Sequence, residues 1–342
     1  MNRSRALPLA AATIVIGLGA AACSSSATAA GPGSGSATGS TSGSSAKTAD
    51  LVISTLNNPF FVSLKNGAEA EAEKDGIALD VQNANNSDST ELNFVTTDVV
   101  KKPGVLILDP TSSDAAAASV KQANGASVPV VAFDRQPQSG TLKAFVGYNA
   151  IDAGKRAADA LATTIHDKGN VVEVEGILGT NVAQDRHTGF RQEIAKYPNI
   201  HVVAAQSANF DQATALDVMT NILQAHPDVQ GVYAANDEMA LGVLAALKSR
   251  NLTGKVAVVG NDGIEQALAA IQDGQEGATN AESAFAEGQR VVDLADDVLQ
   301  GKQIPQASET LEGTLVTKAN LKSYAQTLVS IGDSADVPPD LR

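Results

Sequence analysis

The sequence predicts an α/β fold built from two parallel sheets. Short apolar runs rich in β-branched residues alternate with amphipathic helical patterns along most of the chain. Repeated strand–helix units of this kind form parallel sheets with helices on both faces and right-handed crossovers. About 290 residues follow residue 49, close to the length at which one core gives way to two domains. The two sheets are therefore expected to belong to two domains.

The elements can be placed from the pattern of apolar residues and turn residues. The first strand leads into a helix that starts at Pro59, and further helices are expected over 153–165, 212–224 and 238–248. A short helix is expected from Lys318. Strands are expected at 51–55, 77–81, 105–108, 130–133, 171–174, 201–205, 231–234, 256–259 and 277–281.

Residues 1–22 have the pattern of an export signal. Two early arginines are followed by an apolar run, 6–20, that is too short to cross a bilayer. The run ends in Ala20-Ala21-Ala22-Cys23, which resembles a bacterial lipoprotein lipobox except that Ala20 replaces the more usual leucine. Lipidation of Cys23 is expected, and a structural cysteine is the alternative. An exported protein anchored to the outer face of the cell membrane follows from this interpretation.

The segment 23–49 is predicted to be a lipidated cysteine and a flexible linker. Residues 24–49 are almost wholly Ser, Gly, Ala and Thr, with Lys47 as the one charge. A coil of this length reaches about 25 to 30 Å. Cys23 is the only cysteine, so no intrachain disulfide can stabilise the folded part and its core must suffice.

Charge and motif content exclude several classes of function. The net charge is −14, or −16 once the two signal arginines are removed, which disfavours nucleic acid and anionic lipid as partners; solubility is the simpler explanation of the acidity. No nucleophile elbow, phosphate loop or dinucleotide fingerprint occurs. Catalysis, a cofactor and a metal are therefore not expected. The chain has four histidines, and their spacing is not that of metal ligands. They are His166, His187, His201 and His226.

The loop after the first strand is the most informative segment. Residues 54–61 read STLNNPFF and lie at the carboxyl end of a strand, where open α/β sheets bind ligands. A hydroxyl, amides and two phenyl rings stand together there, which suits the hydroxyls and the C–H faces of a sugar. The alternative is that Asn58 caps a helix with Pro59 at its first position, and that Phe61 is a core residue.

Polar residues also follow the later strands. If the sheets are parallel, these positions converge at the same edges. Carboxylates accept hydrogen bonds from neighbouring hydroxyls, and an arginine fork donates to ring and hydroxyl oxygens, so the set suits a polyhydroxylated ligand; helix capping or a surface turn is the alternative for each residue alone. The residues are Asp109, Asp134, Arg135, Asn236, Asp262 and Glu282.

Residues 50 to about 318 resemble the ribose-binding protein family of periplasmic-binding-protein-like sugar receptors. The segments that carry the resemblance are Ser54 to Leu64, Asp134 to Gln136, Arg186 with Gly189-Phe190, Asn209 to Asp211 and His226 to Gly242. The resemblance implies a periplasmic binding protein type I fold, in which two doubly wound domains are joined by a three-strand hinge. The lobes would be 50–147 with 283–311 and 148–282 with 312–330, followed by a loose tail, 331–342.

The resemblance also assigns a ligand site. Phenyl rings would sandwich a pyranose ring, Asp134, Asp262 and Asn236 would accept from its hydroxyls, and two arginines would donate. The first-lobe contacts would be Ser54, Asn58, Phe60, Phe61, Asp109, Asp134 and Arg135; the second-lobe contacts would be Arg186, Phe210, Asn236 and Asp262, with Glu282 at a hinge crossing.

Two acidic residues and one asparagine depart from the family pattern and leave the sugar open. Asp109 and Glu282 stand where ribose-binding proteins carry an asparagine and a glutamine, and Asn261 stands where the family often has an aromatic residue. Each acidic residue lacks an amide donor, so the facing ligand atom must donate, be cationic, or leave the carboxyl protonated. Ribose, another pentose, a hexose, a short polyol and an amino sugar all remain open.

The resemblance implies a monomeric, non-catalytic, sugar-binding lipoprotein of an ABC importer, with a permease as its partner. Contacts from both lobes imply that the hinge closes on the ligand. A tethered sensor that presents its closed form to a signalling receptor is an alternative. A sugar-responsive repressor shares the fold but needs an N-terminal helix-turn-helix, and a signal and linker occupy that place. Glycosidase chemistry is disfavoured because Asp134, beside an arginine, suits permanent ionisation.

Overall fold

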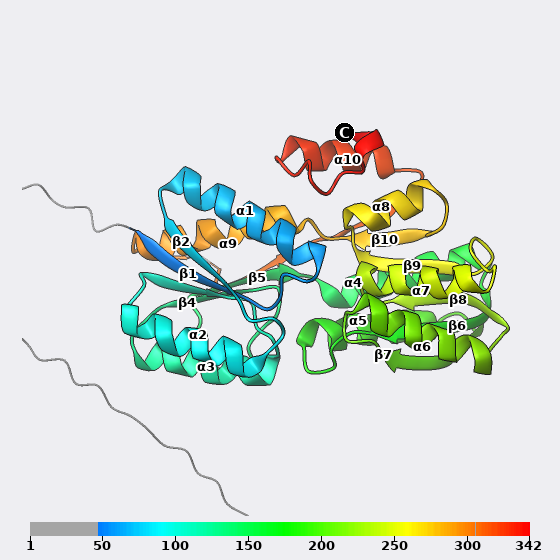
Figure 1. Cartoon of the computed structure of the whole chain (residues 1–342), viewed down its shortest axis with the longest axis horizontal. Coiled ribbons are helices and arrows are strands. Elements are labelled where there is room, and N and C mark those ends of the chain that lie inside the picture. The colour runs from blue at the N-terminus through cyan, green and yellow to red at the C-terminus, as the bar shows by residue number, and fades with distance from the viewer. Residues whose placement is uncertain (1–46, 305) are drawn as a thin grey trace, which may run out of the picture. The chain divides into compact units, whose positions relative to one another are not determined.

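A computed structural model describes residues 47–304 and 306–342, which form two six-stranded sheets covered by helices (Figure 1). Neighbouring strands run parallel in both sheets, apart from β12, which is antiparallel to β10. The first sheet has the order β11-β5-β4-β3-β1-β2 and the second has the order β12-β10-β9-β8-β6-β7. The predicted arrangement of two doubly wound sheets is confirmed.

The first lobe is the first sheet with the helices on its two faces. Helices α1 and α9 cover one face, and α2 and α3 cover the other (Figure 1). Its strands are β1 (Thr48–Ile53), β2 (Ala78–Asn83), β3 (Val105–Leu108), β4 (Val130–Phe133), β5 (Ala144–Tyr148) and β11 (Ser308–Leu311), and its helices are α1 (Pro59–Asp75), α2 (Asp88–Lys101), α3 (Ser113–Gly125) and α9 (Ala284–Leu299).

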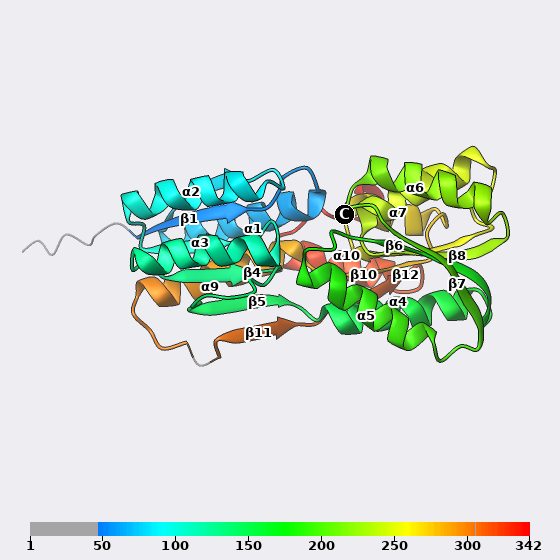
Figure 2. The same ribbon diagram turned by 90° about the horizontal axis from the view of Figure 1, so that it is seen from below.

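The second lobe is built in the same way. Helices α4 and α5 cover one face of its sheet, and α6 and α7 cover the other (Figure 2). Its strands are β6 (Lys168–Glu175), β7 (Asn199–Ser207), β8 (Val229–Ala234), β9 (Ala257–Asp262), β10 (Ala278–Ala281) and β12 (Thr314–Thr317), and its helices are α4 (Ala150–Thr164), α5 (Asn181–Ile194), α6 (Gln212–Ala225), α7 (Asp237–Ser249), α8 (Glu265–Gln272) and α10 (Leu321–Ser330).

The expected strands and helices are all present, but three strands were not predicted. Strand β5 contains a glycine, Gly147, and follows a polar loop, so its apolar run is short. Strands β11 and β12 are four residues each and only partly buried, which leaves no continuous apolar pattern. Their pairing with β5 and β10 places them at the ends of the two sheets. Strand β1 begins at Thr48, so residues 48 and 49 belong to the sheet and not to the expected linker.

The chain passes between the lobes three times. The crossings lie between β5 and α4, between β10 and α9, and between β11 and β12. Figure 2 shows β11 beside β5 at the edge of the first sheet, just before the chain enters the second lobe. The predicted signal 1–22, Cys23 and the linker up to residue 46 lie outside the described residues. No helix in the described ranges is long and apolar enough to cross a membrane.

Most of each apolar core belongs to one lobe, although Ile264 and Ala267 of the second lobe pack into a first-lobe cluster, and close helix pairs hold the ends of the elements in place. In the first lobe, α1 packs directly on α9: a Cβ on Gly67 would lie 2.1 Å from the Phe285 carbonyl oxygen, and a Cβ on Gly288 would lie 2.0 Å from the Leu64 carbonyl oxygen. Only glycine permits this approach. The contact fixes the first turn of α1, which carries Phe60 and Phe61, relative to the hinge crossing before α9.

The C-terminal segment differs from the expected loose tail. The helix expected from Lys318 is present as α10, and the segment after it folds back. Val337 is fully buried in a cluster with Leu321 and Leu328, and Asp333 is buried beside it. The prediction was wrong because two prolines and an aspartate separate Val337 from Leu341, and the segment shows no local periodicity.

Candidate functional site

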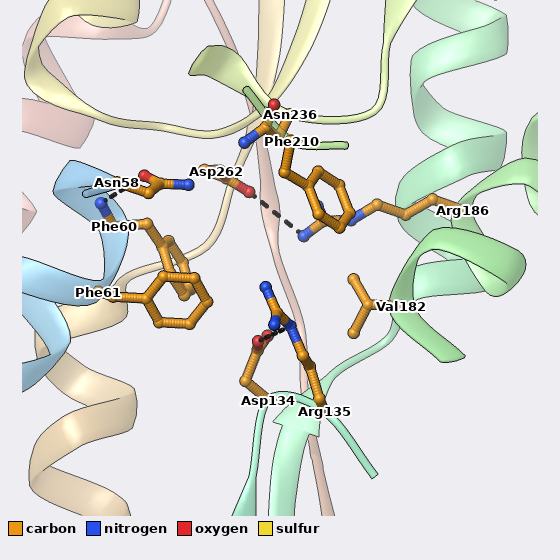
Figure 3. A pocket seen from close by; sticks show the side chains of 10 residues that line it. All are labelled: Asn58, Phe60, Phe61, Asp134, Arg135, Val182, Arg186, Phe210, Asn236 and Asp262. Carbon is orange, nitrogen blue, oxygen red and sulfur yellow. Dashed lines mark hydrogen bonds and ion pairs between the residues drawn. The ribbon is translucent and has the colours of Figure 1, made fainter. Parts of the chain in front are cut away.

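A small cavity of about 20 Å³ lies where the carboxyl ends of the strands of both lobes face each other (Figure 3). This volume is well below the roughly 300 to 1,000 Å³ of typical small-molecule sites, so the lobes must part to admit a ligand. Nine of the twelve residues expected to bind ligand line it, together with Val182. The lining residues are Asn58, Phe60, Phe61, Asp134, Arg135, Val182, Arg186, Phe210, Asn236 and Asp262.

The first turn of α1 supplies an amide and two phenyl rings to the cavity. Asn58 is the N-cap of the helix and its Oδ1 accepts from the Phe60 N–H at 2.9 Å, with Pro59 in the first turn. Phe60 and Phe61 are buried and meet edge to face, with centroids 5.2 Å apart. Asn58 therefore caps α1 and also lines the cavity, and its Nδ2 can donate to a ligand.

Arg135 joins the two lobes at the cavity through its guanidinium. Its Nη1 donates to the carbonyl oxygens of Pro110 and Thr111 at 3.2 and 3.4 Å. Its Cζ lies 5.2 Å from the centre of the Phe61 ring and 6.0 Å from that of Phe210, within the range of cation–π attraction. The side chain is buried, so its remaining N–H groups point into a space with little water.

Three lining residues have a backbone conformation that side chains rarely adopt. The φ angle is 52° at Asp134, 57° at Phe210 and 121° at Asp262. Strain of this kind persists only where the surroundings enforce it, and it gathers at functional sites. A Cβ on Gly176 would lie 2.1 Å from the Phe210 Cζ, so a glycine there makes room for the ring.

Arg186 is the cation of the second lobe and is almost fully held by protein groups. Its Nη1 donates to the Ala235 carbonyl oxygen at 2.8 Å, and its Nη2 lies 2.6 Å from Glu282 Oε2 and 3.3 Å from Asp262 Oδ1. Its buried Nε has no partner among the described residues. Asn236 caps α7 through its Oδ1, which accepts from the Met239 N–H at 3.0 Å.

Three residues expected to contact the ligand lie behind the lining instead. The Asp109 Oδ2 accepts from the Ser54 N–H at 2.9 Å, and its Oδ1, like the Ser54 hydroxyl, has no partner in the described part of the chain. One carboxylate oxygen of Glu282 accepts from Arg186. The other accepts from the Asn280 amide nitrogen at 3.2 Å. Sequence reasoning missed Val182, which is an ordinary apolar residue of the first turn of α5 and carries no chemical signal.

Carboxyl groups outnumber guanidinium groups in and directly beneath the cavity. Burial raises the pKa of the Asp109 carboxyl to about 7, against the effect of the Arg135 guanidinium. Burial also raises the pKa values of Asp262 and Glu282, and Arg186 opposes both shifts. Such a site favours a ligand that donates hydrogen bonds. The carboxyl groups are Asp109, Asp134, Asp262, Glu282 and Glu287, and the guanidinium groups are Arg135 and Arg186.

The two lobes are in contact at the rim of the cavity. The Ser113 N–H donates to the Gly179 carbonyl oxygen at 3.1 Å, the Gln136 N–H donates to Asn181 Oδ1 at 2.8 Å, and the Asn181 N–H donates to the Ser113 hydroxyl at 3.2 Å. These bonds join α3 and the loop after β4 to the start of α5. The lobes are therefore closed over the cavity.

Two groups of carboxylates could approach a metal ion away from the cavity. In one group, Glu173 already accepts from the Arg191 Nε at 2.6 Å, with Glu175 and His187 beside it. The other consists of Glu71, Asp75 and Asp293, and Glu71 is paired with Lys74. Since a protein cation already occupies each group, neither is assigned as a metal site.

A family model described as periplasmic binding protein domain matches residues 49–303. The chain belongs to the periplasmic binding protein family. The ribose import binding protein of Salmonella typhimurium (strain LT2) is 42% identical over 279 residues, covering 82% of this chain and 93% of the relative. The ribose import binding protein of Bacillus subtilis (strain 168) is 40% identical over 267 residues, covering 78% and 86%.

A solved structure is also similar to this chain. It is an ABC transporter periplasmic solute binding protein from Actinobacillus succinogenes 130z with bound D-allose, with a TM-score of 0.77 and 32% identity, covering 81% of this chain and 99% of that structure. The periplasmic binding protein type I fold predicted from the sequence is thus confirmed. As a periplasmic binding protein, the chain is an exported substrate-binding protein and not an enzyme.

Proposed function

We propose that this protein binds a monosaccharide between its lobes as the substrate-binding subunit of an ABC importer, with ribose as the first candidate. The observation that carries the proposal is the composition of the cavity, where phenyl rings stand beside carboxylates and guanidinium groups. The likeness to the two ribose import binding proteins supports ribose, because 42% and 40% identity extend over most of each relative.

The lining groups have distinct roles in this proposal. Phe60, Phe61 and Phe210 cover the faces of the sugar ring and exclude water. Asp134 and Asp262 accept from hydroxyls, the amide nitrogens of Asn58 and Asn236 and the Arg135 guanidinium donate, and Arg186 contributes its Nε. Charge-assisted hydrogen bonds contribute roughly 1.5 to 3 kcal/mol each, and a micromolar ligand needs about 8 kcal/mol net. A few such bonds therefore suffice after ordering costs.

Other sugars are the alternative ligands. The related structure with bound D-allose supports a hexose as the second candidate. Asp109 and Glu282 lie behind the lining, where Asp109 accepts from the backbone of Ser54 and Glu282 holds the lining residue Arg186. The closed form could be presented to a permease for uptake or to a signalling receptor. Uptake through a permease is the function that we propose.

We also propose that the protein acts as a monomer tethered through lipidated Cys23. The sequence Ala20-Ala21-Ala22-Cys23 and the Ser/Gly-rich stretch after it support this anchor. Mass spectrometry of the membrane fraction tests it: a diacylglycerol adduct on Cys23 is expected, and release of an unmodified soluble chain would contradict it.

A thermal-shift screen of the purified protein tests the ligand. The panel holds ribose, other pentoses, hexoses, polyols and amino sugars. A ligand at 100 times its dissociation constant adds about 2.7 kcal/mol to stability, which raises the unfolding temperature by several degrees. Ribose is expected to give the largest shift, and no shift with any compound would overturn the proposal.

A matched pair of variants ties the response to the cavity. Arg135→Met removes a lining guanidinium and should abolish most of the shift. Arg191→Met removes a guanidinium that pairs with Glu173 outside the cavity, and its shift should match that of the wild type.

A further inference from the structure

Glu287 is a buried carboxyl beneath the cavity that none of the lining roles uses. It lies on the first turn of α9, directly after a hinge crossing, and is fully buried. Its Oε1 accepts from the Asp134 N–H at 3.1 Å, a donor that it shares with the Val146 carbonyl oxygen at 2.9 Å. Its Oε2 has no partner among the described residues. A buried carboxyl oxygen without a partner is costly, so its presence calls for a role.

The surroundings of Glu287 determine its charge. The carboxyls of Asp134, Glu282 and Asp109 face it from the ends of β4, β10 and β3, and the Tyr148 hydroxyl faces it from β5. In the described ranges no lysine or arginine forms an ion pair with it. Burial and these like charges hold the pKa of Glu287 well above its usual range. The uncharged acid is the form that this environment tolerates.

The residue that Glu287 contacts is one of the three lining residues with a strained backbone. Asp134 has a φ of 52°, a left-handed conformation that a residue with a side chain adopts only under constraint. This turn directs the Asp134 carboxylate into the cavity beside Arg135 (Figure 3). Glu287 Oε1 is a second acceptor for the Asp134 N–H and fixes this turn. A negative charge on Glu287 would repel the Asp134 carboxylate.

We propose that Glu287 is a positioning residue of the ligand site, whose Oε1 holds the Asp134 turn so that the Asp134 carboxylate faces the ligand. This inference rests on the proposed function, because sugar affinity is its readout. Glutamine has the same shape as the uncharged acid and keeps the acceptor oxygen. Methionine has a similar volume and lacks the acceptor.

The test compares Glu287→Met and Glu287→Gln with the wild type by calorimetric titration of ribose between about pH 5 and pH 8. The control is Glu276→Met, which removes another buried carboxyl with both oxygens unpartnered in the described part of the chain. Glu276 precedes β10, whereas Glu282 follows it, so the control lies at the other end of that strand from the site.

Glu287→Met is expected to raise the dissociation constant roughly ten-fold, while Glu287→Gln and Glu276→Met stay within about three-fold of the wild type. Wild-type affinity should fall toward high pH as Glu287 ionises, and this fall should be smaller in Glu287→Gln. Wild-type affinity in Glu287→Met, or equal weakening in both Glu287 variants, would overturn the inference. If Glu287→Met does not fold, an unchanged pH profile in Glu287→Gln overturns it. Absence of wild-type binding would instead refute the proposed function.

Discussion

Removing Glu282 should destabilise the protein through the buried cation that it holds. The guanidinium of Arg186 and the carboxyl of Glu282 are both buried and lie 2.6 Å apart. Because an arginine stays protonated, this hydrogen bond is charge-assisted. Glu282→Met keeps the volume of the side chain and removes the acceptor, so Arg186 loses its shortest ionic contact.

The magnitude follows from what remains around Arg186. Breaking a buried ion pair costs about 3 to 5 kcal/mol when the other charge is left uncompensated. Asp262 still lies 3.3 Å from the Arg186 Nη2, and the Ala235 carbonyl oxygen still accepts from Nη1. The loss should therefore lie near the lower bound, about 3 kcal/mol. Glu282→Gln, which keeps an acceptor oxygen, should cost about half as much.

Urea unfolding at about pH 7, followed by circular dichroism, measures both variants against the wild type. The two lobes have largely separate cores, so a second probe is needed to show that they unfold together. If Glu282→Met unfolds within about 0.5 kcal/mol of the wild type, Arg186 does not depend on Glu282 and the reasoning fails. If Glu282→Gln loses as much free energy of unfolding as Glu282→Met, the negative charge of Glu282 stabilises Arg186 and an acceptor oxygen alone does not.

Three further predictions follow from the structure. Asp109→Asn and Glu282→Gln should leave the ranking of sugars unchanged in competition titrations, because both residues lie behind the cavity lining; a new ranking would make them selectivity determinants. Gly67→Ala should destabilise the protein by roughly 2 kcal/mol in urea unfolding, because its Cβ would meet a backbone oxygen of α9. Gly125→Ala is the control: the described structure leaves open space around Gly125, so this variant should be neutral or slightly stabilising. Equal effects of the two substitutions would contradict the prediction. Burial raises the pKa of Asp50 from 3.8 to about 6, so the folded state holds a proton that the unfolded state has lost. The free energy of unfolding should therefore fall as the pH rises from about 4 through about 6. Asp50→Asn should lack this slope, and a pH profile identical to that of the wild type would refute the prediction.

Much of the site could be predicted because its residues follow strands directly. Asp134 and Asp262 come at the ends of apolar runs that are visible in the sequence, and parallel pairing brings strand ends together without further information. Asn58 was recognisable from the proline and the phenylalanines after it. The expectation that the groups of both sheets face one cavity came from the resemblance to the ribose-binding protein family.

The parts that were not predicted depend on contacts between distant segments. Glu282 follows a strand like the others, but its pairing with Arg186 is set by packing across 96 positions of the chain. Glu287 reads as one more polar residue of an amphipathic helix, and only the fold places it under Asp134. Strands β11 and β12 are short and half-exposed, so pairing rather than composition defines them.

Calorimetric titration of the purified wild-type protein with ribose shows whether the cavity between the lobes binds this sugar. Saturable binding is expected at one site per chain with micromolar or tighter affinity, which corresponds to at least about 8 kcal/mol. Binding of another monosaccharide in place of ribose would keep the site and change the ligand. No heat of binding with ribose or with any other sugar of the panel would contradict the claim that the cavity between the lobes is a sugar site.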